Sequence, residues 1–287
     1  MPFLYKYATA ATGISVLATQ ALRWSSPLLF NDPFDVPRDW GGFSLPDLEN
    51  AVIQRFHAYL RGEARPGSQA AIDVLELIQR RPNTESRDEA VDAIRFYSRL
   101  RRQTLEKHLE GFREAWKGRL PGMRVLCLSL DPASPAMWTH YANSHSGVVL
   151  QFESSDERDS PLLLAQPVIY QEAKPRLPTP NEWARTFLGE VELDWDAVLR
   201  EYQFVKSTDW SFEREYRVVS GKKQGETGLF ADYVFHHADL RGVVLGANIA
   251  PQAESLIRDL VAARYHDATI YRAQIDYSQW TIALVAT

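Results

Sequence analysis

The sequence predicts an α+β protein with a mixed, mostly antiparallel sheet and a helical insert. Short runs rich in β-branched and aromatic residues recur towards both ends of the chain, and turn residues separate them. Between about residues 46 and 121 the apolar pattern changes to the helical period and keeps it. We therefore expect a single α+β domain over 1–287, with a helical insert at 46–121.

The N-terminal part is expected to run from strand to helix to strand and then into a long loop. Its elements are a strand at 3–8, a helix at 12–21 and a strand at 22–27 that ends at a proline. Turn signals follow at Asn31-Asp32-Pro33, Val36-Pro37 and Gly41-Gly42. Aromatic residues between these turns give the loop apolar surface to bury, so we expect it to be ordered.

The rest of the chain alternates between the two periods. The insert has helical segments near 47–62, 69–80 and 84–117. After it we expect strands at 123–129, 147–153 and 167–170, a helical stretch at 180–206, a strand within 210–219, strands at 229–235 and 241–246, a helix at 251–264, and strands at 268–275 and 279–286. The segment GKKQGETG lacks the residue order of a phosphate-binding loop, and we interpret it as a hairpin turn.

Composition excludes several classes of protein. The net charge of −5 indicates no global attraction to nucleic acid. The single cysteine, Cys127, excludes a disulfide framework and fits a reducing cytoplasm. No run approaches the roughly 20 apolar residues that span a bilayer, so we expect no membrane insertion. The histidines match no strong zinc pattern, and no metal is expected.

Three stretches combine aromatic rings, turn residues and hydrogen-bonding groups at the end of a strand. They are RWSSPLLFNDPFD, MWTHYANSHSGVVLQFE and WSFEREYRVV. Open sheets usually place ligand sites at strand ends and in the loops that follow them. The three stretches are therefore the best candidates for a functional site.

The last stretch is unusual because charged residues begin a strand-forming run. In an extended chain Glu213, Glu215 and Arg217 lie on one face. Together with Arg214 they could form a cross-strand ion-pair lattice on an exposed sheet, where each pair stabilises by about 0–1 kcal/mol. The alternative is that they form the floor of a polar site.

The phrases SSPLLFNDPFD, LCLS, MWTHYANSHSGVVLQFE and WSFEREYRVV, in this order, resemble the bacterial family catalogued as domain of unknown function 2971. The resemblance covers most of the chain outside the helical insert. It implies no established activity.

A second resemblance is to the ADP-ribosyltransferase superfamily, which shares the order of a polar first strand, a helix, a strand and a late strand that opens with glutamate. Its members cleave nicotinamide from NAD and pass ADP-ribose to a protein, a nucleic acid or water. The catalytic glutamate often lies in an E-x-E motif, as at Glu213 and Glu215. The resemblance implies NAD as a substrate and, by analogy, a bacterial toxin or an antiviral defence effector.

This resemblance implies roles for individual residues. Glu215 is expected to be the catalytic carboxylate, because an anion beside the ribose stabilises the oxocarbenium-like transition state. Glu213 would orient the acceptor or pair with Arg217. Tyr141 is expected to stack on nicotinamide, with Trp138 and Phe34 as alternatives.

The expected NAD cleft also includes Ser25 and Ser26 at the end of the second strand, and Asn31 in the NDPFD turn. Asn31 could instead satisfy the backbone of that turn. The first strand offers Lys6 and Tyr7 where the superfamily usually has His or Arg, and a lysine cannot reproduce a fork of donors.

This departure favours a different class of function. The alternative is a non-catalytic module in which the same cleft binds a nucleotide, a nucleic acid or a protein, while the insert contacts partners.

Overall fold

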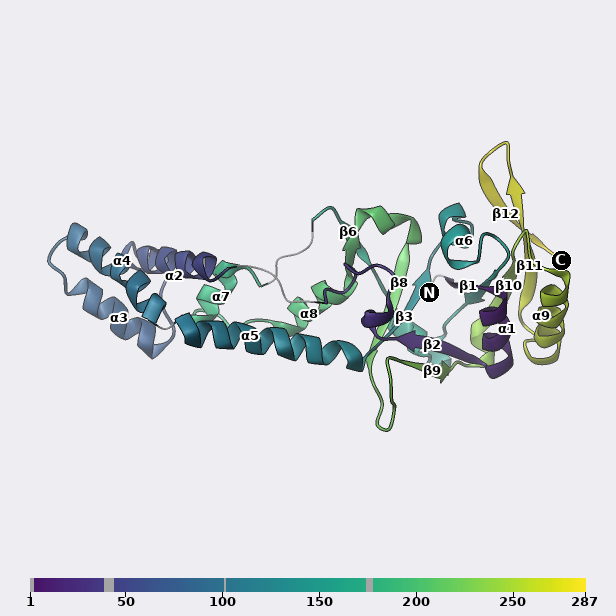
Figure 1. Ribbon diagram of the computed structural model, residues 1–287, viewed down its shortest axis with the longest axis horizontal. Helices are drawn as coiled ribbons and strands as arrows, with labels where there is room; N and C mark the ends of the chain where they lie inside the picture. Colours follow the sequence, from purple (N-terminus) through teal and green to yellow (C-terminus); the bar gives the residue numbers. More distant parts are fainter. Residues whose placement is uncertain (1–2, 39–43, 101, 174–177) are drawn as a thin grey trace. The chain divides into compact units, whose positions relative to one another are not determined.

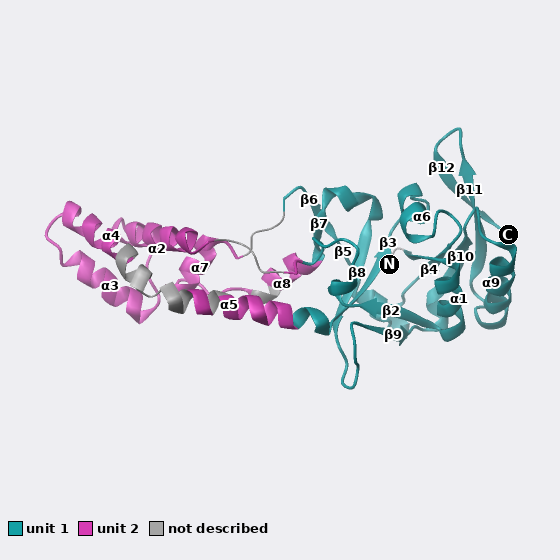
Figure 2. Cartoon of the chain, viewed as in Figure 1, with its two compact units in different colours: residues 1–36, 119–174, 204–287 teal, residues 37–118, 175–203 magenta. Residues whose placement is uncertain are grey.

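A computed structural model describes residues 3–38, 44–100, 102–173 and 178–287 (Figure 1). The chain divides into two compact units (Figure 2). The first, here called the sheet unit, comprises 1–36, 119–174 and 204–287; the second, the helical unit, comprises 37–118 and 175–203. The helical unit overlaps the insert expected at 46–121 and adds a second segment of chain. The turn expected at Gly41-Gly42 lies outside the described residues.

The sheet unit is built on a ten-stranded sheet. Its strands are β1 (Leu4–Ala8), β2 (Ala21–Ser25), β3 (Met123–Ser129), β4 (Val148–Phe152), β5 (Gln166–Pro167), β8 (Glu215–Gly221), β9 (Phe230–Val234), β10 (Leu240–Leu245), β11 (Thr269–Asp276) and β12 (Thr281–Ala286). The main order is β12-β11-β10-β4-β1-β3-β2-β9, with β8 and β5 branching from β3. Of the pairings described in this sheet, β10 with β11 is parallel and the others are antiparallel. This confirms the predicted α+β class with a mixed, mostly antiparallel sheet.

Helices cover both faces of the sheet. They are α1 (Ala10–Thr19), α6 (Pro135–Tyr141) and α9 (Pro251–Arg264). Alternation along β4 separates two cores: Leu150 packs in the core with α1 and α9, which lie side by side in Figure 1, and Val149 packs in the core with α6. Helix α1 approaches β4 closely at Gly13, where a Cβ atom would lie 2.3 Å from a methyl group of Val148.

The sheet forks at β3. One edge of β3 pairs with β8 along its whole length. The other edge is shared, since β1 pairs with it at Tyr5↔Ser129 and β2 pairs with it at Ser25↔Val125. Between these two pairings, the ammonium of Lys6 donates to the main-chain oxygen of Cys127 at 2.9 Å. A side chain therefore satisfies this carbonyl at a point where the neighbouring strands diverge.

The helical unit contains most of α5 and α8 and all of four other helices. The six are α2 (Leu45–Leu60), α3 (Gln69–Gln79), α4 (Thr84–Leu100), α5 (Arg102–Arg119), α7 (Pro180–Phe187) and α8 (Trp195–Phe204). A core that includes Ile53 and Phe56 joins α2 to α3 and α4. Glycines allow the chain after α2 to meet the chain after α7, because a Cβ atom on Gly67 would lie 1.9 Å from the carbonyl oxygen of Gly189.

Shorter elements complete the chain. The 3₁₀ turns are η1 (Pro27–Leu29), η2 (Leu120–Gly122), η3 (Asp156–Arg158), η4 (Pro161–Leu164), η5 (Thr208–Glu213) and η6 (His237–Asp239). A small parallel pair consists of β6 (Ile169–Gln171) and β7 (Val205–Ser207). Among the described helices, none has the length and apolar character needed to cross a membrane.

Three expectations for local structure are wrong. The helical stretch expected at 180–206 ends at Phe204, and 205–207 forms β7 beside β6. The strand expected within 210–219 begins only at Glu215, because η5 occupies the preceding residues. The GKKQGETG segment is no hairpin turn, since β8 before it pairs with β3 and β5 whereas β9 after it pairs with β2. In the first and third cases tertiary strand pairing overrides the local pattern.

Candidate functional site

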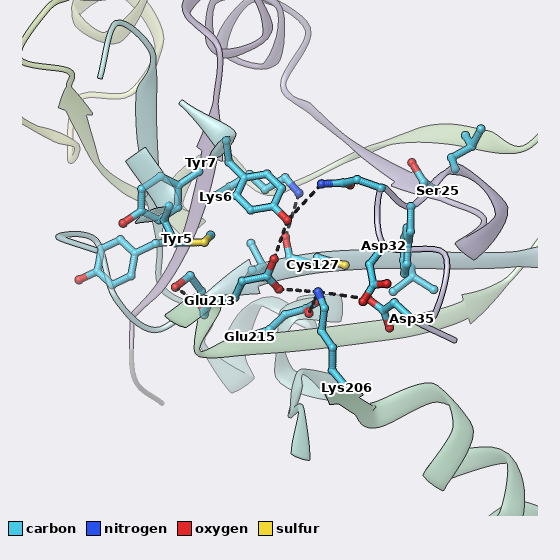
Figure 3. A pocket seen from close by; sticks show the side chains of 18 of the residues that line it. Tyr5, Lys6, Tyr7, Ser25, Asp32, Asp35, Cys127, Lys206, Glu213 and Glu215 are labelled. Carbon is cyan, nitrogen blue, oxygen red and sulfur yellow. Dashed lines mark hydrogen bonds and ion pairs between the residues drawn. The ribbon is translucent and has the colours of Figure 1, made fainter. Parts of the chain in front are cut away.

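A cavity of about 230 Å³ lies in the sheet unit, at the fork in the sheet (Figure 3). Strands β1, β2 and β3 contribute one part of its lining, and the loop after β2 and helix α6 contribute another. The last part comes from β7, the end of η5 and the first residue of β8. All three stretches singled out in the sequence therefore reach this cavity.

The E-x-E motif enters the cavity through a bend in the backbone. Glu213 ends η5 and Glu215 begins β8, while Arg214 between them has a left-handed backbone with φ of 44°. The left-handed region costs an L-residue about 1–2 kcal/mol. The end of β3 holds the bend, because Ser129 Oγ donates to the Glu213 carbonyl at 2.7 Å and the Leu130 N–H donates to the Arg214 carbonyl at 3.0 Å.

Both carboxylates line the cavity and are almost fully buried. The exposed fraction is 4% for Glu213 and 5% for Glu215, whereas the side chain of Arg214 is 60% exposed. Arg217 lies on the same face as the two glutamates and is fully buried. The alternative of an ion-pair lattice on an exposed sheet is therefore wrong, and the motif forms a buried polar floor.

Arg217 binds two carboxylates. Its Nε and Nη2 atoms donate to Oε1 and Oε2 of Glu215 at 2.7 and 2.8 Å, which is a bidentate fork. Nη2 also donates to Asp35 Oδ2 at 2.6 Å. Asp35 comes from the loop after β2 and is 3% exposed. The loop and β8 are thereby joined through one buried guanidinium.

Lys206 contacts these two carboxylates and that of Glu213 as well. Its Nζ lies 2.5 Å from Glu213 Oε2, 3.3 Å from Glu215 Oε2 and 3.2 Å from Asp35 Oδ2. Figure 3 shows this ammonium joined to Glu213 and Asp35. We call Asp35, Lys206, Glu213, Glu215 and Arg217 the ion cluster. Its three carboxylates outnumber its two cations, so its formal charge is −1.

Tyr141 of α6 extends the network above Glu213. Its hydroxyl donates to Glu213 Oε1 at 2.5 Å, and Asn31 Nδ2 donates to the same hydroxyl oxygen at 3.3 Å. Both oxygens of Glu213 are therefore occupied, one by Tyr141 and one by Lys206. Asn31 acts on this network rather than on the backbone of its own turn.

The two glutamates differ in their proton affinity. Burial raises the pKa of Glu213, and together with the like charge of Glu215 it outweighs the lowering by Lys206 and Tyr141. Burial also acts on Glu215, but the charge and hydrogen bonds of Arg217, together with Lys206, lower its pKa to about 2. Glu215 is thus an anion at any physiological pH, while Glu213 is the more easily protonated of the pair.

Most of the residues expected at an NAD site line this cavity. Besides Glu213 and Glu215 these are Lys6, Tyr7, Ser25, Asn31 and Tyr141, whereas Arg217 supports the floor through Glu215 and Asp35.

Three of the expected residues lie elsewhere. Ser26 is fully buried and donates to the main-chain oxygen of Leu120 at 2.7 Å. Trp138 is fully buried and packs edge-on against Tyr7, with ring centroids 5.6 Å apart. Phe34 is 78% exposed and does not line the cavity. Tyr141 is thus the one of the three proposed stacking rings that reaches it.

Sequence reasoning missed two members of the ion cluster. Lys206 lies at the end of the helical stretch expected at 180–206, where a lysine is ordinarily solvated. Asp35 ends the NDPFD stretch, whose composition is typical of a turn. A signal for Lys206 exists in retrospect, because it follows Phe204 and Val205, which are both buried, in an apolar run. Asp35 carries no local signal, since its partners are 171 and more residues away in the chain.

The described residues include no group of three or more His, Cys, Asp or Glu side chains arranged to hold a metal ion. In the ion cluster, the ammonium of Lys206 already lies among the three carboxylates that would otherwise be available to bind a metal cation.

The fold and the site together define an α+β protein with an open, mostly antiparallel sheet and a buried ion cluster beside a cavity. Residues 137–218 match the family described as "Protein of unknown function (DUF2971)". This confirms, over that segment, the resemblance expected from the sequence. The segment includes Tyr141, Lys206 and the E-x-E motif but not Asp35 or Lys6. No curated protein and no solved structure matches the chain.

Proposed function

We propose that this chain is an ADP-ribosyltransferase-like enzyme, which cleaves the bond between ribose and nicotinamide in NAD and transfers ADP-ribose to an acceptor. The observation that carries the proposal is that both carboxylates of an E-x-E motif, at the start of a late strand, line one cavity. The same cavity is lined by Lys6 and Tyr7 of the first strand and by Tyr141.

Glu215 suits the role of the catalytic carboxylate. Cleavage of the glycosidic bond develops positive charge on the ribose, and a fixed anion stabilises charge that exists only in the transition state. The pKa of about 2 keeps Glu215 ionised, and the fork from Arg217 fixes its orientation. The formal charge of −1 on the ion cluster favours a cation in the same way.

Glu213 suits the role of a base for the acceptor. Its pKa is raised by burial, in the direction that makes a carboxylate a better proton acceptor near neutral pH. Tyr141 holds Glu213 through one carboxylate oxygen and places an aromatic ring in the cavity wall. The nicotinamide ring would stack on it.

The cavity fits one end of the dinucleotide. Its volume of about 230 Å³ lies below the roughly 300–1,000 Å³ of typical small-molecule pockets. The nicotinamide and its ribose would therefore be enclosed, and the rest of NAD would lie along the opening. The ammonium of Lys6 donates one of its three N–H groups to the main-chain oxygen of Cys127, and the other two could donate to a ribose or phosphate oxygen.

One observation favours a non-catalytic binding module. Arg217 and Lys206 engage both oxygens of Glu215, an arrangement also found in buried ion pairs that only brace a fold. In this second function the cavity binds a nucleotide, or a group of a nucleic acid or protein, without breaking a bond.

The test follows nicotinamide release from NAD by the full chain, with protein, DNA, RNA or water as acceptor. Glu215→Gln is expected to lower the rate by about 10²–10³-fold, since it removes one preorganised charge. Glu153→Gln is the matched control, because Glu153 is partly exposed and pairs with Arg241 at 3.1 Å outside the cavity. No release with any acceptor, or equal release by Glu215→Gln, would count against the enzyme. Binding of NAD without release would support the binding module.

A further inference from the structure

The ammonium of Lys206 is surrounded by carboxylates of the chain. An ammonium carries three N–H donors, and Nζ of Lys206 has three carboxylate neighbours within 3.3 Å, one each from Asp35, Glu213 and Glu215. The side chain is 6% exposed. Although Lys206 lines the cavity, it donates hydrogen bonds to Glu213 and Glu215 and forms an ion pair with Asp35.

The surrounding structure holds this ammonium in place. Strand β7 pairs with β6 at Tyr170↔Lys206, and the ring of Trp210 lies with its centroid 5.0 Å from Nζ. A buried lysine is costly unless it is paired. Here the carboxylates outweigh the desolvation and raise the pKa of Lys206 above its ordinary value.

The two glutamates depend on Lys206 to different degrees. Glu215 keeps the bidentate fork of Arg217 if Lys206 is removed. Glu213 keeps only the hydroxyl of Tyr141 among its side-chain hydrogen bonds, and it then faces the like charge of Glu215. Removal of Lys206 would therefore release Glu213 rather than Glu215.

We propose that Lys206 is a positioning residue, which fixes the two carboxylates of the E-x-E motif relative to each other so that they act on a bound ligand as one unit. This inference rests on the proposed function, for which Glu213 must be ionised beside a fixed Glu215. The titratable and charged groups that surround the pair come from six elements and are Asp35, Cys127, Tyr141, Tyr170, Lys206 and Arg217.

The first experiment measures the pH profile of nicotinamide release for Lys206→Met, Lys206→Arg and the exposed control Lys222→Met. For Lys206→Met we expect a maximal rate about 100-fold lower, the cost of misplaced reacting groups. The acid limb of the profile should move up by about 1–3 pH units, because Glu213 loses the cation beside it. KM for NAD should change little, since the ammonium of Lys206 acts on the carboxylates rather than on the ligand. Lys206→Arg should keep the acid limb near its wild-type position, and Lys222→Met should match the wild type.

The second experiment does not depend on turnover. The carboxyl carbons of glutamate are labelled with ¹³C and titrated by NMR, and the Glu213 signal is assigned from its loss in Glu213→Gln. In Lys206→Met this signal should titrate at a higher pH than in the wild type. An unshifted Glu213 titration overturns the proposal for Lys206, even where the wild type releases nicotinamide. A second outcome is that the Glu213 titration shifts but the wild type releases no nicotinamide. The contact between Lys206 and Glu213 is then supported, but both the proposed function and the positioning role in catalysis fail.

A third measurement covers the case in which Lys206→Met does not fold. In wild-type protein labelled with ¹⁵N at lysine Nζ, the Lys206 ammonium should remain protonated above pH 10.5, the ordinary value for lysine. Its protons should exchange slowly with water. A signal that deprotonates with the exposed lysines overturns the inference.

Discussion

Two glutamates in different parts of the chain have almost the same immediate partners. Glu190 in the helical unit is held by Arg55, with Nε to Oε1 at 2.7 Å and Nη2 to Oε2 at 2.5 Å. Glu215 in the sheet unit is held by Arg217 with the same atoms, at 2.7 and 2.8 Å. The side chains of both glutamates are nearly buried, with exposed fractions of 7% and 5%.

The surroundings of Glu190 and Glu215 differ in the charged groups other than the arginine that binds each carboxylate. Around Glu190 there is a second arginine, Arg185 at 3.3 Å, and the hydroxyl of Tyr59, so cations outnumber the carboxylate. Around Glu215 two more carboxylates are added, and a cavity adjoins them. A buried ion pair alone therefore does not identify a functional site. We base the proposed site on a surplus of one charge beside an open volume, because such a surplus could interact with a ligand.

The largest effect on stability is expected from replacement of Arg217 in the sheet unit. Arg217→Met leaves Glu215 and Asp35 buried without their main cation, and such a loss costs about 3–5 kcal/mol. The free energy of unfolding in urea should fall by that amount. A fall of less than about 1 kcal/mol would mean that the fork is as dispensable as an exposed pair.

A second effect of similar size depends on pH. The pKa of Glu215 is about 2 in the folded chain and 4.5 in a free side chain. A lowered pKa contributes stability that is present above pH 4.5 and is lost as the pH falls through 2, about 3 kcal/mol in all. Glu213 has the opposite sign, because its raised pKa favours folding at low pH. Unfolding between pH 5 and 2 should therefore be steeper with pH in the wild type than in Glu215→Gln, and parallel curves would contradict the assignment.

Substitution of Glu190, which is bound by Arg55 in the helical unit, should lower stability but leave nicotinamide release unchanged. Glu190→Gln keeps one acceptor for Arg55 but leaves other donors unsatisfied, at a cost of about 1–3 kcal/mol. Nicotinamide release by the folded variant should equal that of the wild type. A loss of turnover as large as in Glu215→Gln would remove the contrast between the two glutamates.

The smallest effect is expected at Arg214, three residues before Arg217. Glycine adopts the left-handed backbone freely, so Arg214→Gly relieves about 1–2 kcal/mol and loses about 0.5–1 kcal/mol to added chain entropy. The exposed pair with Asp131, at 3.7 Å, contributes little. We expect a gain of less than about 1 kcal/mol in thermal or urea unfolding. A large loss would show that Arg214 also supports the site.

Local pattern predicted the parts of the fold that local physics controls. The strands, the helices and the shared face of Glu215 and Arg217 follow from periodicity, and the structure confirms that face within β8. Glu213 was expected on the same face of an extended strand, but it lies in η5 and is buried by the bend at Arg214. The long helix expected at 84–117 is α4 and α5, which share its pattern.

The rest of the site depends on contacts that no local window contains. Asp35 meets Lys206 and Arg217 only because the fold brings the loop after β2 against β7 and β8. The three residues of β7 are too few for a periodic signal, and they pair with β6 from 36 residues earlier at Tyr170↔Lys206. Phe34 and Trp138 illustrate the converse, since aromatic residues near a site have the same composition whether they are exposed, buried or in its wall.

The pair of Asp35 and Lys206 also lies where the chain passes between its units. Asp35 is two residues before Pro37, where the chain enters the helical unit, and Lys206 is three residues after Gln203, where it leaves for the last time. Within the sheet unit, their contact at 3.2 Å therefore joins the segment before the chain first enters the helical unit to the segment after it last leaves that unit. These two boundaries of the sheet unit therefore lie within three residues of a charged side chain that lines the cavity.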